Sequence, residues 1–135
     1  KNNLIIRAPA QGINDRNFGE NRVLWSGAKW PDDTQTLTLS EKISGQPNGA
    51  VFLFSKYADD TWVNAEWTSY FVPKCFVKYF NGNGIAMSDP YYGTFKYLYV
   101  SDTSVKGHDI NNGSGANNGV KYDNRKHVLR YIIGV

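Results

Sequence analysis

The fold is decided by the stretch Gly107–Val135, GHDINNGSGANNGVKYDNRKHVLRYIIGV. An Asn/Gly-rich tract leads there into an apolar segment, HVLRYIIGV, which continues to the last residue. Bulky side chains occupy both faces of this segment, in two alternating sets: Val128, Arg130 and Ile132, and Leu129, Tyr131 and Ile133. The pattern predicts a strand inside a sheet and close to the core. The tract Asn111–Asn118 predicts a loop along which the chain crosses from one sheet to another.

Short β-rich runs bounded by turn residues recur through the rest of the chain, and no long helical pattern is seen. The runs are RVLWSG, QTLTLS, AVFLFSKY, WTSYFVP, KCFVKYF, TFKYLYVSDT and HVLRYIIGV. Leu37 and Leu39 share one face of QTLTLS, and AVFLFSKY predicts a central strand. Pro73 predicts a bend or sheet crossing between two strand pieces. About eight short strands predict an all-β fold, an antiparallel β-sandwich or jelly-roll-like head domain.

Length and composition limit the possible classes of protein. The 135 residues are predicted to form one domain, and the single cysteine excludes a disulfide within the chain. The net charge of +3 comes from scattered Lys and Arg, which argues against nucleic acid as a partner. No apolar run approaches the roughly 20 residues that span a bilayer, so membrane insertion is not expected. Because an initiator Met is lacking, residues 1–22 are predicted to be a lead-in from a longer chain and residues 23–135 the head domain.

Candidate catalytic groups are few. His108–Asp109 is predicted to bond the local backbone in a turn, since no G-x-S-x-G nucleophile motif is present. Cys75 occupies an alternating position that predicts a buried core thiol. Glu41 and Glu66 could form the carboxylate pair of a glycosidase, although the sequence gives no distance between them. We predict no catalytic residue and no cofactor.

Two acidic pairs, Asp32–Asp33 and Asp59–Asp60, lie on predicted loops. Calcium takes roughly six to eight oxygen ligands, and the chain contains no D-x-[DN]-x-[DN]-G pattern. These carboxylates are predicted to be solvated turn residues, with no metal site. A calcium ion shared by the two loops is the alternative that the sequence leaves open.

The aromatic residues carry the functional signal. Trp25 is predicted to lie in the core, whereas four aromatics stand in polar, turn-like contexts: KWPDD, DDTWVN and SDPYYG. The apolar face of a sugar ring stacks on such a side chain, while neighbouring carboxylates and amides bond its hydroxyls. The predicted ligand-binding residues are Trp30, Asp32, Asp33, Asp59, Trp62, Asn64, Tyr91 and Tyr92. The alternative is that these aromatics anchor their own loops or pack against another subunit.

Several segments together resemble a known family. They are VLWSG (23–27), TLTLSEKIS (36–44), QPNG (46–49), YFVPK (70–74), KYLYVSDTSVKGHDINN (96–112) and HVLRYIIGV (127–135). In this order they resemble the C-terminal head domain of receptor-binding or baseplate tail-tip proteins of phages that infect Gram-positive bacteria. The resemblance implies a β-sandwich head, a homotrimer, binding to cell-wall polysaccharide or teichoic acid, and contacts to other tail proteins through an N-terminal part. It carries over no catalytic residue.

The expected function is therefore non-enzymatic attachment of a phage tail to a host cell-wall glycan. The expected location is the virion tail tip, assembled in the host cytoplasm. Two alternatives remain open: a structural tail or baseplate domain without receptor contact, and a wall-degrading glycosidase.

Overall fold

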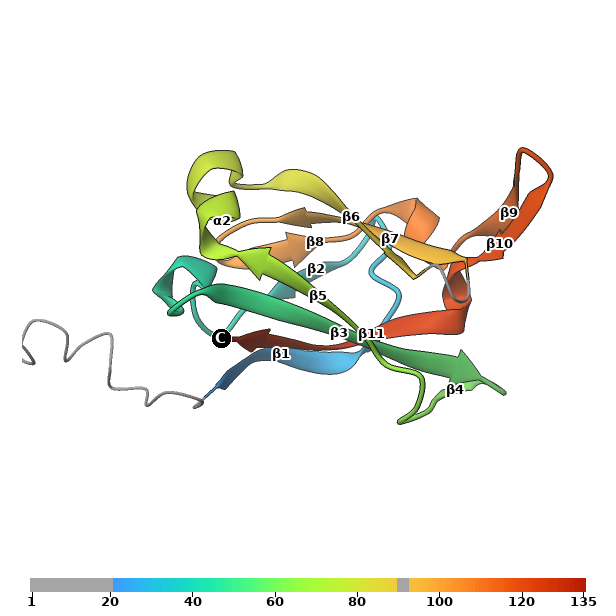
Figure 1. The fold of residues 1–135 in the computed structure, drawn as a ribbon, viewed down its shortest axis with the longest axis horizontal. Coiled ribbons are helices and arrows are strands. Elements are labelled where there is room, and N and C mark those ends of the chain that lie inside the picture. The colour runs from blue at the N-terminus through green and yellow to red at the C-terminus, as the bar shows by residue number, and fades with distance from the viewer. Residues whose placement is uncertain (1–20, 90–92) are drawn as a thin grey trace, which may run out of the picture.

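The computed structural model describes residues 21–89 and 93–135, in which the chain forms two packed antiparallel sheets (Figure 1). In the first sheet β1, β11 and β3 are neighbours, and both β4 and β5 pair with β3. Its strands are β1 (Arg22–Lys29), β11 (His127–Gly134), β3 (Gly49–Ala58), β4 (Thr61–Trp62) and β5 (Thr68–Pro73). The second sheet has the order β2 (Thr36–Thr38), β8 (Ser104–Lys106), β7 (Thr94–Val100) and β6 (Asn83–Asp89). This architecture confirms the predicted all-β sandwich.

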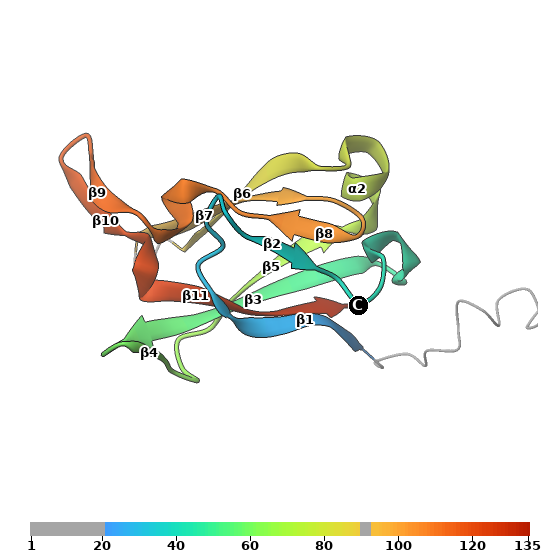
Figure 2. The same cartoon turned by 180° about the vertical axis from the view of Figure 1, so that it is seen from behind.

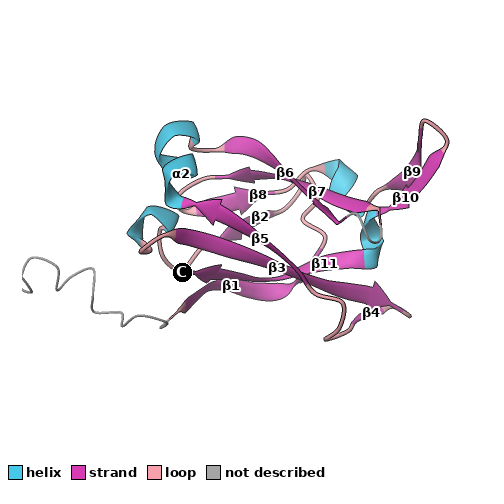
Figure 3. Cartoon of the chain, in the orientation of Figure 1, coloured by secondary structure: helices cyan, strands magenta, loops and turns pink. Residues whose placement is uncertain are grey.

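The core lies between the two sheets, whose strands are distinguished from the helices and loops in Figure 3. Alternation along the strands builds it: Leu98 and Val100 of β7 point inward, whereas Tyr97 and Tyr99 are half-buried on the outer side. The inward residues of the first sheet include Leu24, Phe52, Phe54, Val72, Leu129 and Ile132, and those of the second Leu37, Met87, Leu98, Val100 and Val105. Burying each large side chain of this kind contributes about 1.5–3 kcal/mol.

The terminal strand β11 has the central position that its sequence predicts. It pairs with β1 on one side and with β3 on the other. The last residue is also fixed, because the Val135 amide donates to the Gly49 oxygen and the amides of Asn48 and Gly49 donate to the Val135 oxygen. The C-terminal segment therefore belongs to the core of the first sheet.

The Asn/Gly-rich crossover is more structured than the predicted loop. It runs through a 3₁₀ turn, η2 (Asp109–Asn112), a hairpin of β9 (Ser114–Asn117) and β10 (Val120–Asp123), and a second 3₁₀ turn, η3 (Asn124–Lys126). Asn118 and Gly119 have φ angles of 51° and 80°, the left-handed conformation of a two-residue hairpin turn. The view from behind shows this hairpin projecting beyond the two sheets (Figure 2). The prediction of a sheet-to-sheet crossover is confirmed, and that of an irregular loop is wrong.

Two buried asparagines hold this crossover to β7. The Asn111 side chain accepts from the Tyr97 amide at 2.6 Å and donates to the Tyr97 oxygen at 2.9 Å. The Asn124 side chain accepts from the Phe95 amide at 2.9 Å. These side-chain amides satisfy main-chain groups of a strand much as another strand would. Lys96 adds bonds from its Nζ to the main-chain oxygens of Asn111 and Asn124.

The segment after Pro73 corrects the sequence prediction. Instead of a second strand piece, Lys74–Phe80 forms the short helix α2, and Cys75 on it is exposed rather than buried. Pro73 ends β5 with φ −68° and ψ 147° and stands at the N-cap of the helix. Val77 is buried and Phe76 packs against the core, so one side of the helix closes an end of the sandwich. No helix in the described residues is long and apolar enough to cross a membrane.

Candidate functional site

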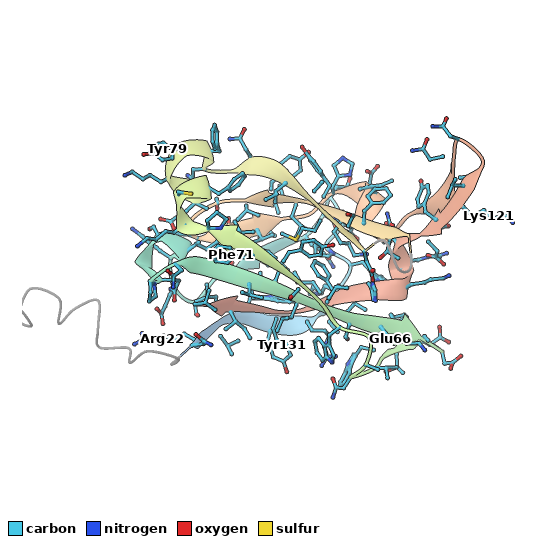
Figure 4. The ribbon with its side chains drawn as sticks, in the orientation of Figure 1. Arg22, Glu66, Phe71, Tyr79, Lys121 and Tyr131 are labelled. Atoms are coloured by element: carbon cyan, nitrogen blue, oxygen red, sulfur yellow. The ribbon has the colours of Figure 1, made fainter. Side chains whose placement is uncertain are left out.

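Three aromatic side chains surround one arginine on the outer side of the first sheet. The Arg130 guanidinium carbon lies 3.8 Å from the Trp62 ring centre, 5.2 Å from that of Trp67 and 5.7 Å from that of Tyr131. A register shift between Leu129 and Tyr131 marks a bulge in β11 at Arg130. Tyr131 points away from the second sheet (Figure 4). The bulge thus places an arginine beneath aromatic rings that face outward.

Arg130 is held by neutral acceptors. It is 5% exposed, its Nε donates to the Gly27 oxygen at 3.2 Å, and its Nη1 donates to Ser55 Oγ and to Asn64 Oδ1, each at 3.0 Å. No carboxylate in the described part of the chain forms an ion pair with it. Trp62 covers the guanidinium while remaining 44% exposed. A cation–π contact of this kind contributes roughly 1–2 kcal/mol and fixes the orientation of the ring.

The aromatic surface continues toward the end of the sheet. Tyr57 is the cross-strand partner of Trp62, so their side chains project on the same side. The Trp30 ring lies 4.7 Å from the Tyr57 ring at 67°, and Trp30 Nε1 donates to the Arg125 oxygen at 3.1 Å. A pocket of about 260 Å³ opens beside this pair, lined by Trp30, Tyr57, Asp59, Asp60, Asp123, Arg125 and Lys126. We define the aromatic face as Trp30, Tyr57, Trp62, Trp67 and Tyr131, with Arg130 beneath them.

The structure brings together four of the predicted binding residues at this end of the first sheet: Trp30, Asp59, Trp62 and Asn64. Asp32 and Asp33 belong elsewhere. Asp32 accepts bonds from the Thr34 hydroxyl and amide at 2.6 and 2.9 Å, which lower the pKa of its carboxyl below the ordinary 3.8. Asp33 lines a pocket on the second sheet.

The remaining aromatic predictions have different outcomes. Tyr91 and Tyr92 lie outside the described residues. Trp25 is partly buried and packs against the core cluster, close to its predicted place.

Sequence reasoning missed Tyr57, Trp67, Tyr131 and Arg130. Strict alternation would place Tyr131 on the same face as the buried Leu129, and only the bulge at Arg130 turns it to the outer side, so its position could not be inferred from the sequence. The convergence of Trp62 and Trp67 on Arg130 depends on a bulge and on the β3–β4 hairpin, neither of which has a signal in the sequence.

The candidate catalytic groups occupy structural positions. Glu41 pairs with Arg22 at 3.1 Å, and Glu66 pairs with Lys56 at 3.2 Å. Arg22 and Glu66 lie at opposite ends of the molecule (Figure 4), so the two glutamates do not share a site. His108 Nδ1 accepts from the Ile110 amide at 3.0 Å, which confirms its predicted role in a turn.

Metal ligands do not cluster in the part of the chain that the structure describes: no group of three or more His, Cys, Asp or Glu side chains there could hold an ion. No protein-family model matches the sequence, and the curated proteins contain no match to it.

Proposed function

We propose that this chain is the non-enzymatic receptor-binding head of a phage tail, and that it binds host cell-wall saccharide through the aromatic face. The observation that carries the proposal is the set of exposed rings held over the buried guanidinium of Arg130. Trp67 is 41% exposed and Trp62 44%, and because they gather with Tyr131 over one arginine they form a contiguous aromatic patch, the kind of surface that marks an interaction site. The resemblance to tail-tip head domains supports a virion location.

The chemistry of the face suits a carbohydrate. Sugar rings present apolar C–H faces that stack on indole and phenol rings, and they also need polar partners for their hydroxyls. Asn64 and Asp59 stand at the edge of the aromatic face and are exposed. Arg130 bonds the Asn64 side chain and lies against the Trp62 ring, so both are ordered before a ligand arrives. Little side-chain entropy is therefore lost when the ligand binds.

A second part of the same sheet supports assembly into a homotrimer. Val23, Ile133, Val51 and Phe71 follow one another in register across β1, β11, β3 and β5. Val23 and Phe71 are each 52% exposed. A row of apolar side chains across an outer sheet face suits burial against another subunit. Three weak saccharide sites in one trimer would then strengthen attachment through avidity.

The test is binding of the fluorescently labelled domain to Gram-positive cell walls, before and after removal of teichoic acid and wall polysaccharide. Trp67→Ala is expected to weaken binding by at least about ten-fold through loss of a stacking surface. Tyr79→Ala is the matched control, because Tyr79 is also an exposed aromatic but lies on α2, away from the aromatic face (Figure 4).

Each outcome separates the candidate functions. Binding that is lost on stripping, without release of reducing sugar, supports the proposal. Sugar release from the walls would favour the glycosidase. Absence of binding to a broad panel of walls, with Trp62 and Trp67 protected from quenchers in the oligomer, would favour the structural tail domain.

A further inference from the structure

A pocket of about 630 Å³ lies on the outer side of the second sheet. It is formed where β7 and β8 meet the loop that leads into η2 and the loop between β1 and β2. Its lining residues are Asp33, Gly82, Tyr99, Ser101, Ser104, Lys106, Gly107, His108 and Asp109. Its volume falls in the range of small-molecule sites, roughly 300–1,000 Å³. It shares no lining residue with the aromatic face.

The aromatic wall of this pocket is fixed. The Tyr99 ring lies 5.4 Å from Tyr97 in an edge-on arrangement and 6.3 Å from His108 at 33°. His108 is held by the bond from the Ile110 amide to its Nδ1. Tyr97 covers Gly84 so closely that a Cβ there would collide with its ring. Tyr99 is therefore a preorganised surface rather than a mobile side chain.

The floor of the pocket is also rigid. The Gly107 amide donates to the Gln35 oxygen at 3.0 Å, and a Cβ at Gly107 would collide with the main-chain oxygen of Pro31. Ser101 and Ser104 form a tight turn in which their hydroxyls lie 2.9 Å apart. Both serines line the pocket, and the bonds within the turn hold their hydroxyls in place.

The charges in the pocket are mixed, with two carboxylates and one amine. Lys106 is the cross-strand partner of Tyr99, so its side chain projects on the same side of the sheet. In the described part of the chain, the side chains of Asp33 and Lys106 form no hydrogen bond or ion pair with another residue. Asp109 contacts His108 Nδ1 at 2.9 Å. Two carboxylates against one amine give the pocket an excess of negative charge at neutral pH.

We propose that this pocket is a second saccharide site, specific for a neutral sugar unit and closed to polyanionic polymers. Tyr99 would stack on the apolar face of the ring, Asp33 and Asp109 would accept bonds from sugar hydroxyls, and Lys106 would donate to a hydroxyl or ring oxygen. Two carboxylates repel phosphate groups, so a poly(glycerol phosphate) chain is disfavoured there. The inference goes beyond the function proposed above and does not depend on the aromatic face.

The experiment is saturation-transfer NMR on the full chain with glucose, galactose, rhamnose, N-acetylglucosamine and glycerol 1-phosphate as probes. The diagnostic variants are Asp33→Ala and Lys106→Ala, since both side chains are exposed and their loss leaves the core intact. The matched comparison is the double variant Trp62→Ala/Trp67→Ala. At least one neutral sugar is expected to keep binding the double variant through this pocket. The same sugar should bind the Asp33→Ala and Lys106→Ala variants about ten-fold more weakly than the wild type.

The two proposals fail separately in this design. If every sugar signal survives both pocket substitutions, or if no neutral sugar gives a signal, the second site is refuted. If glycerol 1-phosphate binds and its signal depends on Lys106, the predicted exclusion of polyanions is refuted. Signals that are lost only in the tryptophan double variant would leave the aromatic face as the one saccharide site and overturn the inference.

Discussion

The buried amine of Lys96 predicts that the domain becomes more stable as the pH rises from 7 to 9. Lys96 is 3% exposed, and its Nζ donates to main-chain oxygens of the crossover. Burial lowers the pKa of Lys96 from 10.5 to about 7, and the negative charge of Asp123 opposes this only in part. The unfolded chain therefore holds a proton on Lys96 between pH 7 and pH 10.5 that the folded chain has released.

The size of the effect follows from these two pKa values. The full difference corresponds to a penalty of ~5 kcal/mol for burying the charged amine at low pH. This penalty is fully present below pH 7 and is relieved as the pH rises toward 10.5. Between pH 7 and 9 the free energy of unfolding should rise by about 2 kcal/mol. Burial also lowers the pKa of the neighbouring His127 below 6.5; the charge of Asp89 opposes this shift and that of Lys96 adds to it. Since the folded chain resists protonation of His127, acid destabilises the fold further.

The assay is urea unfolding followed by tryptophan fluorescence at pH 6, 7, 8 and 9, with a constant m-value as the sign of two-state behaviour. The matched variant Lys96→Met keeps most of the side-chain volume and should lose the rise, although it will be less stable at pH 9 because two carbonyls lose a donor. A direct ¹⁵N or ¹³C titration of Lys96 in the wild type covers the case in which this variant does not fold. A free energy of unfolding that stays flat or falls from pH 7 to 9 would refute the reasoning.

Three further predictions concern residues whose environments are defined. Trp62→Ala should weaken wall binding at least about ten-fold yet cost only ~1–2 kcal/mol of stability, because it uncovers Arg130 without opening the core; unfolding of the domain, or unchanged binding, in equilibrium and pull-down measurements would contradict this. Deletion of residues 129–135 should abolish cooperative folding, since β11 lies between β1 and β3; a soluble truncated chain with a sigmoidal melting curve would be incompatible with that central role. Cys75 should react with a thiol reagent such as DTNB in the native protein, because it is exposed on α2; reaction only after denaturation would show it to be buried.

The sequence was sufficient for the elements whose pattern reflects burial directly. The alternation in QTLTLS and the two-sided bulk of HVLRYIIGV predict the buried Leu37 and Leu39 and the central β11, as the structure has them. The segment after Pro73 could not be assigned in the same way, because a short apolar run is compatible with either a strand or a helix. There the contacts of Phe76 and Val77 with the core select the helix, and they depend on the complete fold.

The candidate site was predictable only in part. Polar turn contexts identified Trp30 and Trp62, whose positions on the first sheet leave them open to a ligand. Trp67 stands next to a strand and gives no such signal. Asp33 lies one residue from Asp32, yet the two carboxylates face different surroundings, since the first lines a pocket and the second binds Thr34. Such a separation depends on side-chain direction in a loop, which composition does not encode.

The Asn/Gly-rich crossover accounts for how two surfaces on opposite sheets are built from one short domain. Asn111 donates to the Pro31 oxygen, in the loop that joins the aromatic face to the pocket on the second sheet. On one side of that loop, Trp30 donates to the oxygen of Arg125 in η3. On the other side, the His108 amide donates to the Pro31 oxygen, which fixes the pocket floor. The tract that the sequence predicts to be a crossover loop is thus the element to which both candidate binding surfaces are attached. Its asparagines serve this purpose because each side-chain amide carries both donors and an acceptor for buried main-chain groups.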